Sequence, residues 1–128
     1  FGDVVGRSNY AYAKLDLAQT QARLKYQEQQ IALEVSDAVL TLETAAKSVD
    51  ACRVARELAE KQLEAEMKKL NVGLSTNYFV LTYQDQLATR RSLELKALVD
   101  YNVALANIAK VTGSTLETRN ITISDYVR

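Results

Sequence analysis

Residues 70–81, LNVGLSTNYFVL, interrupt what would otherwise be one long helical pattern. The chain has no proline and only four glycines, and Gly73 lies in the middle of this stretch. Glycine readily takes the left-handed conformation that ends many helices. Short polar side chains cap the start of the next helix by accepting its free N–H groups, and the stretch supplies Ser75, Thr76 and Asn77. The sequence therefore predicts a helix, a tight turn at 72–76 and a second helix.

The segment before the turn, from about residue 9 to residue 71, contains no helix breaker. Apolar or small residues recur there every seven residues, which is typical of a coiled-coil seam. One row holds Leu17, Leu24, Ile31, Ala38, Ala45, Cys52 and Ala59, and a second holds Val35, Leu42, Val49, Leu63 and Leu70, with a break at Arg56. We expect a long first helix over 9–71 whose alanines let a partner helix approach closely.

The segment after the turn predicts a second helix over 77–112, closed by Gly113. Its apolar residues fall on two stripes, and a helix with two apolar stripes has neighbours on both sides. The first stripe is Leu81, Ala88, Leu95, Val99, Ala106 and Ala109, and the second is Leu87, Leu98, Tyr101, Leu105 and Ile108. This pattern indicates a wall or ring of helices rather than an isolated pair.

The two predicted helices are unequal, roughly 95 Å and roughly 54 Å long at 1.5 Å per residue. The second helix would cover the first only as far as about residue 35, leaving apolar residues without a partner in this chain: Leu15, Leu17, Leu24 and Ile31. We predict an all-α fold, a long antiparallel coiled-coil-like helical hairpin that is a fragment of an α-helical barrel.

The two ends of the chain are expected to differ from the helices. Residues 1–7 hold two glycines and are predicted to be a lead-in. Residues 113–128 are predicted to form an extended tail, because Ile121 and Ile123 alternate with polar residues as in a short strand. The start at Phe1 leads us to expect a processed protein or a piece of a larger one.

The composition argues against several classes of function. Sixteen basic and sixteen acidic residues cancel, so no long-range field favours nucleic acid. The absence of histidine, together with a single Cys52, removes the usual zinc ligands and general bases, and we expect no metal, no cofactor and no enzyme activity. The apolar runs are too short for a membrane-spanning helix.

Two stretches, LNVGLSTNYFVLTYQDQLATRR and LVDYNVALANIAKVTG at 98–113, together resemble the TolC family of outer-membrane efflux proteins. The upstream part, with Glu28, Glu34, Val35 and Ala38 before an alanine-rich helix, also follows that family's pattern. The resemblance implies a periplasmic hairpin from one of two repeats in a trimeric exit duct. Membrane contact would then come only through parts that this chain lacks.

The resemblance also implies a role for the turn. In that family the corresponding turn sits at the periplasmic tip and docks against a membrane-fusion adaptor, which connects the duct to an inner-membrane pump. Here the adaptor-binding residues would be Val72, Gly73, Leu74, Ser75 and Thr76. Family members often carry an acidic residue where this chain has Phe79. We therefore expect an apolar constriction or a contact with a neighbouring hairpin at Phe79 instead of a ring of charge.

Several of these residues also have simpler, purely structural interpretations. The turn residues could serve only as helix caps, although Leu74 at the apex has nowhere in its own hairpin to bury. Tyr78, Tyr83 and Tyr101 are expected to fill grooves between helices with their hydroxyls reaching water, and Cys52 to pack in the seam. Acidic residues near a seven-residue spacing could line a lumen or lie on a solvated surface: Asp37, Glu43, Asp50 and Glu57. A generic coiled-coil scaffold or tether is the alternative function, because it explains the heptads equally well.

Overall fold

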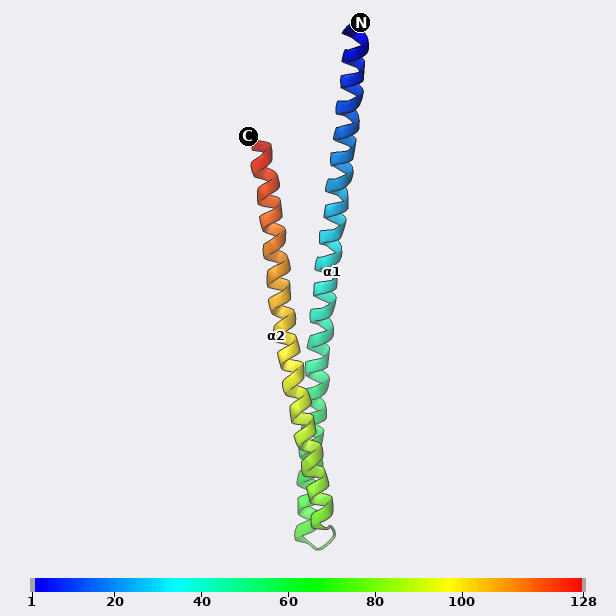
Figure 1. Ribbon diagram of the computed structural model, residues 1–128. Coiled ribbons are helices and arrows are strands. Elements are labelled where there is room, and N and C mark those ends of the chain that lie inside the picture. Colours follow the sequence, from blue (N-terminus) through cyan, green and yellow to red (C-terminus); the bar gives the residue numbers. More distant parts are fainter. Residues whose placement is uncertain (1, 128) are drawn as a thin grey trace. The chain divides into compact units, whose positions relative to one another are not determined.

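The computed structural model describes the backbone of residues 2–127 and the side chains of residues 2–117. Two helices make up this described part, α1 over Gly2–Asn71 and α2 over Asn77–Val127. Figure 1 shows the end of α1 and the start of α2 joined by a turn, from which α2 runs back in the opposite direction. The prediction of an all-α helical hairpin is confirmed.

The chain divides into two compact units, with the division between Asp37 and Ala38 inside α1. In the first unit, residues 2–37 are continuously helical and most of their side chains are exposed. Of the residues predicted to lack a partner, Leu15 and Leu17 are exposed, whereas Leu24 and Ile31 are half-buried. The second unit holds the remainder of α1, the turn and α2.

The predictions for both ends of the chain are wrong within the described residues. α1 begins at Gly2, so residues 2–7 are helical rather than a lead-in. α2 does not close at Gly113 but continues to Val127, so the backbone of 113–127 is not extended. A glycine inside a helix costs only about 1 kcal/mol relative to alanine, and the surrounding residues outweigh it. The side chains of Ile121 and Ile123 lie outside the described residues.

The core of the second unit is narrow and consists largely of small side chains. Four of the six buried hydrophobic residues in the described part are alanines: Ala38, Ala59, Ala97 and Ala104, with Val80 and Leu87 completing the set. The two predicted rows on α1 are confirmed between residues 38 and 70, because every member of both rows there is buried or half-buried. Small seam residues let the two helix axes approach closely.

The seam of α2 differs from the predicted stripes. Most of its buried and half-buried residues also follow a seven-residue step, in one row of Val80, Leu87, Glu94, Tyr101 and Ile108. A second row holds Tyr83, Ala97, Ala104 and Val111 and is interrupted by the exposed Arg90. The predicted second stripe is therefore only partly correct, since Leu98 and Leu105 are exposed. The predicted first stripe, from Leu81 to Ala109, is exposed at every position. We call this set, Leu81, Ala88, Leu95, Val99, Ala106 and Ala109, the outer stripe.

Candidate interaction site at the tip of the hairpin

Backbone hydrogen bonds at the end of α1 fix the shape of the turn. The N–H of Gly73 donates to the carbonyl of Leu70 at 3.1 Å, and the N–H of Leu74 donates to the carbonyl of Lys69 at 2.8 Å. This pair of bonds is the Schellman motif, which requires a residue with positive φ. Gly73 has φ of 79°, the only positive φ in the described chain. The predicted glycine-terminated helix is confirmed.

A side-chain bond ties the turn back to α1. The hydroxyl of Ser75 donates to Oε1 of Glu66 at 2.5 Å, and Nζ of Lys69 lies 3.7 Å from Oε2 of the same carboxylate. The Glu66 side chain is only 12% exposed, so this bond forms in a partly desolvated position. Ser75 thus binds the helix before the turn and not, as predicted, the helix after it.

The start of α2 is capped through the backbone of Thr76. Its carbonyl accepts the N–H of Val80 at 3.3 Å, which makes Thr76 the residue that opens the helix. Among the described hydrogen bonds, none runs from an α2 amide to the side chain of Ser75, Thr76 or Asn77. The prediction that these side chains cap α2 is therefore wrong in this structure.

The turn and the first residues of α2 expose several apolar side chains. Leu74 is 77% exposed at the apex, as expected, because its own hairpin offers it no pocket. Val72, Tyr78 and Phe79 are exposed beside it. The rings of Tyr78 and Phe79 meet edge to face, with centroids 5.6 Å apart. We call these four residues, Val72, Leu74, Tyr78 and Phe79, the tip patch.

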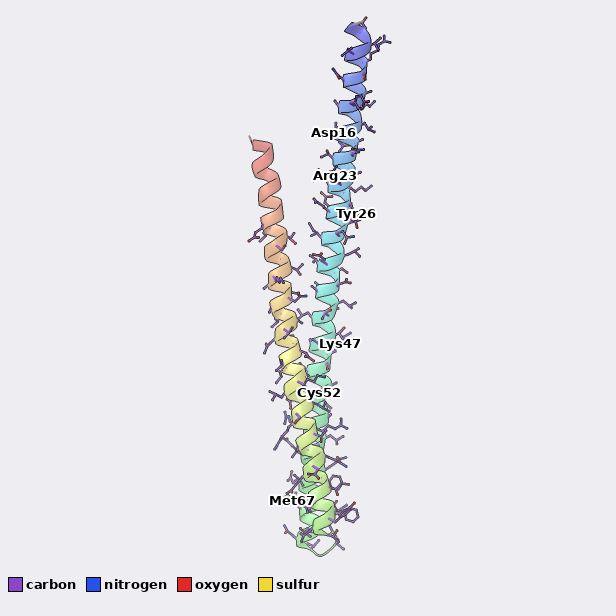
Figure 2. All side chains as sticks on the ribbon, viewed as in Figure 1. Asp16, Arg23, Tyr26, Lys47, Cys52 and Met67 are labelled. Atoms are coloured by element: carbon purple, nitrogen blue, oxygen red, sulfur yellow. The ribbon has the colours of Figure 1, made fainter. Side chains whose placement is uncertain are left out.

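Phe79, the predicted site of an apolar constriction or of a contact with a neighbouring hairpin, belongs to the tip patch. Its side chain is half exposed and contacts the ring of Tyr78. The tip patch contains no charged residue, and the nearest acidic residue along α2 is Asp85. Figure 2 labels Met67 close to the same end of the hairpin, where it adds another exposed apolar side chain. The chemistry of this surface is therefore apolar and aromatic.

One charged layer crosses the seam between the helices. Nε of Arg56 on α1 donates to Oε2 of Glu94 on α2, and another guanidinium nitrogen donates to Oε1 of Glu60 at 3.0 Å. Hydrogen bonding to Glu94, then to Glu60, raises the pKa of Arg56 above its ordinary value. Arg91 approaches Glu60 from α2 at 3.6 Å. Arg56, which interrupts the predicted apolar row, thus pairs across the seam with Glu94 of the opposite helix.

Two of the acidic residues near the seven-residue spacing, Asp50 and Glu57, form ion pairs, and Cys52 lies in the seam. Asp50 and Glu57 both bind Arg53, at 2.6 Å and 3.2 Å, on an exposed face of α1. Hydrogen bonding to Asp50 is the largest cause that raises the pKa of Arg53. Cys52 is half-buried in the seam. These residues form surface ion pairs and packing contacts.

A groove runs along one side of the two-helix seam. Its floor is formed by Ala45, Ala97 and Ala104, and its volume is about 710 Å³. Hydroxyl, amide and carboxylate groups rim it, from Thr41, Thr44, Ser48, Asp100 and Asn107, together with the apolar side chains of Leu40 and Val103. The groove is shallow and open because the seam residues are small.

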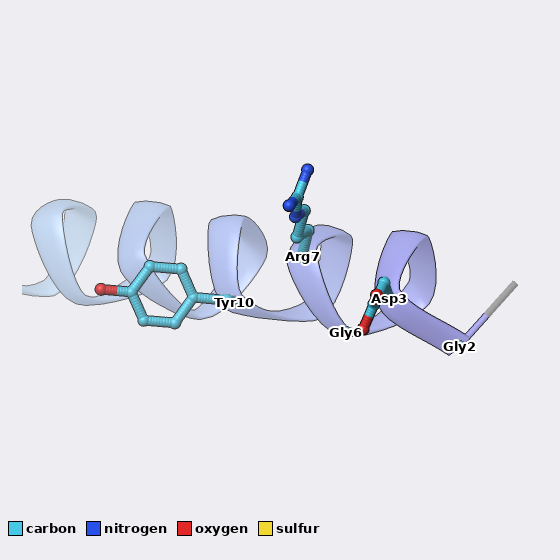
Figure 3. Close-up of a pocket in the computed structure, with 5 residues that line it drawn as sticks. All are labelled: Gly2, Asp3, Gly6, Arg7 and Tyr10. Carbon is cyan, nitrogen blue, oxygen red and sulfur yellow. The ribbon is translucent and has the colours of Figure 1, made fainter.

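The remaining features do not converge on a chemical site. Figure 3 shows Asp3, Arg7 and Tyr10 leaving the first turns of α1 in different directions, without a common point between them. In the described part of the chain, no three or more acidic, cysteine or histidine side chains gather where they could bind a metal ion. Neither helix, over the residues described, has a stretch apolar and long enough to span a bilayer.

Comparison with known proteins gives no further guide, since no family model, no curated protein and no solved structure matches this chain. The tip patch remains the candidate interaction site on the strength of its geometry. It brings Val72 and Leu74 of the predicted adaptor-binding turn together with Phe79, the predicted constriction residue, at one end of the hairpin. Tyr78, predicted from its spacing to pack between helices, is exposed and belongs to the same surface.

Proposed function

We propose that this hairpin is a periplasmic segment of a trimeric outer-membrane exit duct for efflux or secretion, in a Gram-negative bacterium. It docks a membrane-fusion adaptor through its tip, and the adaptor links the duct to an inner-membrane pump. The observation that carries the proposal is the tip patch, in which Leu74 is 77% exposed at the apex of a backbone turn held by two hydrogen bonds. A rigid turn that presents apolar side chains to solvent is suited to contact another protein.

The outer stripe of α2 supports the assembly of several hairpins. Leu81, Leu95 and Val99 are exposed along it, while the seam of the same helix faces α1. An apolar stripe of this length on a helix that already has a partner is suited to pack against a further helix. In the proposed duct, that neighbour is the other repeat or an adjacent protomer.

The exposed surface of the second unit includes a charged face on α1 and an uncharged stripe on α2, which is compatible with a wall of helices that has solvent on one side and neighbouring helices on another. The exposed face of α1 carries the ion pairs that Arg53 makes with Asp50 and Glu57 and that Lys68 makes with Glu64. The outer stripe of α2 carries no charge. A charged face suits solvent, and an uncharged stripe suits a neighbouring helix.

A coiled-coil scaffold or tether is the alternative function. It explains the heptad seam but assigns no role to the exposed apex of the turn. The two functions are separated by replacing Leu74, because only the duct requires an apolar tip.

The experiment introduces Leu74→Asp into the complete protein that carries this hairpin and measures export from whole cells. We expect export and cross-linking to the adaptor to fall by about tenfold or more, as for a central interface residue. Assembly should persist, because the change lies outside the seam and the outer stripe. Asn77→Asp, at the exposed first residue of α2, is the matched control, since it adds the same charge without removing an apolar side chain. Normal export by Leu74→Asp would exclude the docking role.

A further inference from the structure

The charged layer between Arg56 and Glu94 lies in the middle of an otherwise apolar ladder. Taking the bond between these two residues as the reference, the seven-residue step places each neighbouring row member of α1 opposite one of α2. The layers in order are Leu42 with Ile108, Val49 with Tyr101, Arg56 with Glu94, Leu63 with Leu87, and Leu70 with Val80. Leu63 and Leu87 indeed line the same surface depression.

The apolar layers of this ladder discriminate weakly between registers. If α2 slid by one heptad along α1, aliphatic or aromatic residues would again meet aliphatic residues. The other seam row is made largely of small side chains, with Ala45, Cys52 and Ala59 on α1 and Ala97 and Ala104 on α2. Ala45, Ala97 and Ala104 line one groove together. Packing alone therefore leaves several registers close in free energy.

The layer formed by Arg56 and Glu94, in contrast, discriminates strongly between registers. After a slide of one heptad, Arg56 would face Leu87 or Tyr101, and Glu94 would face Leu63 or Val49. The Arg56 and Glu94 side chains are only 25% and 18% exposed. After a slide, Glu94 would be left without Arg56 in a partly desolvated position, and Arg56 would keep only Glu60 of its own helix. An unpaired charge in such a position is costly, whereas a paired one is close to neutral against an apolar pair.

We propose that the layer formed by Arg56 and Glu94 sets the register of α1 against α2 and thereby fixes which residues stand at the tip. Its contribution is specificity of alignment, in the manner of a polar layer in a coiled coil, and not net stability. A slide of one heptad would move the centre of the turn by three or four residues and remove Gly73 from the position that its positive φ fits. This inference concerns the hairpin itself and holds whether or not it belongs to a duct.

The test measures the alignment of the helices directly. Spin labels are placed on cysteines that replace Lys47 and Thr89, two exposed residues of the second unit, in a chain whose own Cys52 is replaced by alanine. Labelled chains are diluted with unlabelled ones so that only distances within a chain are recorded. Because seven helical residues span about 10.5 Å, a slide of one heptad changes the axial separation of the labels by about that amount.

The decisive variant replaces both partners, Arg56→Leu with Glu94→Leu. We expect a second distance population displaced by about 10 Å, with helix content retained and a denaturation midpoint equal to or above that of the parent. The charge-reversed pair, Arg56→Glu with Glu94→Arg, should restore a single population. A single population in the leucine pair, loss of helix in that pair, or two populations in the reversed pair would each overturn the proposal.

Two controls separate the layer from other features. Arg53→Gln removes the exposed ion pairs on α1 and should leave one distance population. Gly73→Ala strains the turn and should lower the denaturation midpoint while the charged layer keeps a single register. If Gly73→Ala gave the second population, the turn and not the layer would set the register.

Discussion

Ser75 donates its hydroxyl hydrogen to Glu66, nine residues earlier, at 2.5 Å. The bond reaches across the turn, so it holds the exposed apex against the last turns of α1. Glu66 has one further partner, Lys69 at 3.7 Å, and its side chain is largely shielded from water. The stiffness of the tip therefore depends on a hydroxyl group that sequence reasoning assigned to the wrong helix.

Replacing Ser75 by alanine should destabilise the hairpin. Removing the donor leaves the shielded Glu66 carboxylate without its closest partner, and a hydrogen bond to a charged group contributes about 1.5–3 kcal/mol. We expect a loss of about 1–2 kcal/mol in the free energy of unfolding, measured by urea denaturation. Ser92→Ala, at an exposed position on α2, is the control and should change stability by less than about 0.5 kcal/mol. Equal effects of the two changes would show that the bond to Glu66 is not formed in solution.

The seam and the outer stripe of α2 should respond differently to truncation. Leu87 is 6% exposed, and Leu87→Ala should cost about 2–4 kcal/mol because it removes buried methyl groups from a narrow core. Leu95 is 64% exposed, and Leu95→Ala should cost less than about 0.5 kcal/mol within one hairpin. Both are compared at one protein concentration by denaturant unfolding. The reverse ranking would mean that the outer stripe, and not the described seam, faces α1.

The chain should associate in solution through the outer stripe. Its net charge of zero sets up no repulsion between copies, and Leu81, Leu95 and Val99 offer exposed apolar area. Sedimentation should show species larger than a monomer at micromolar concentrations. Leu95→Lys with Val99→Lys should shift the distribution toward monomer, whereas Lys96→Glu, a charge change beside the stripe, should not. A parent chain that sediments as a folded monomer would contradict the assembly on which the proposed function rests.

The turn and the seam of α1 were predictable because each has a local physical signal. Gly73 is the residue that a positive φ requires, and the heptad rows of α1 contrast with charged residues on its other faces. The same reasoning was only partly correct on α2, whose apolar residues surround the helix on several sides: Leu87, Tyr101 and Ile108 lie in the seam, but Leu98 and Leu105 do not. The predicted stripes were drawn through large apolar side chains such as Leu95, whereas the small residues Ala97 and Ala104 are the ones that face α1. The seven-residue step from Val80 through Leu87, Glu94 and Tyr101 to Ile108 was the signal that identifies the correct face.

The partner of Ser75 and the end of α2 could not be predicted, because each depends on contacts that the local sequence pattern does not specify. Ser75 has a short side chain that reaches either helix, and the position of Glu66 decides between them. Gly113 matches a helix end, yet the cost of one internal glycine is smaller than the gain from continuing α2. Arg56 signalled a break in the row, but its role became clear only once Glu94 was found opposite it.

The even spacing of the ladder has a consequence for how the hairpin forms. Leu70 and Val80 are close in sequence, and each later layer joins residues fourteen positions further apart, up to Leu42 and Ile108. Contacts between near neighbours in sequence close fastest, since the lost chain entropy grows with the length of the loop. The hairpin should thus form from the glycine outward, so that the two apolar layers nearest the turn pair before Arg56 meets Glu94. In a misaligned chain these two charges would fail to pair when only the first layers have formed. Such a chain can reopen to the turn by breaking few contacts.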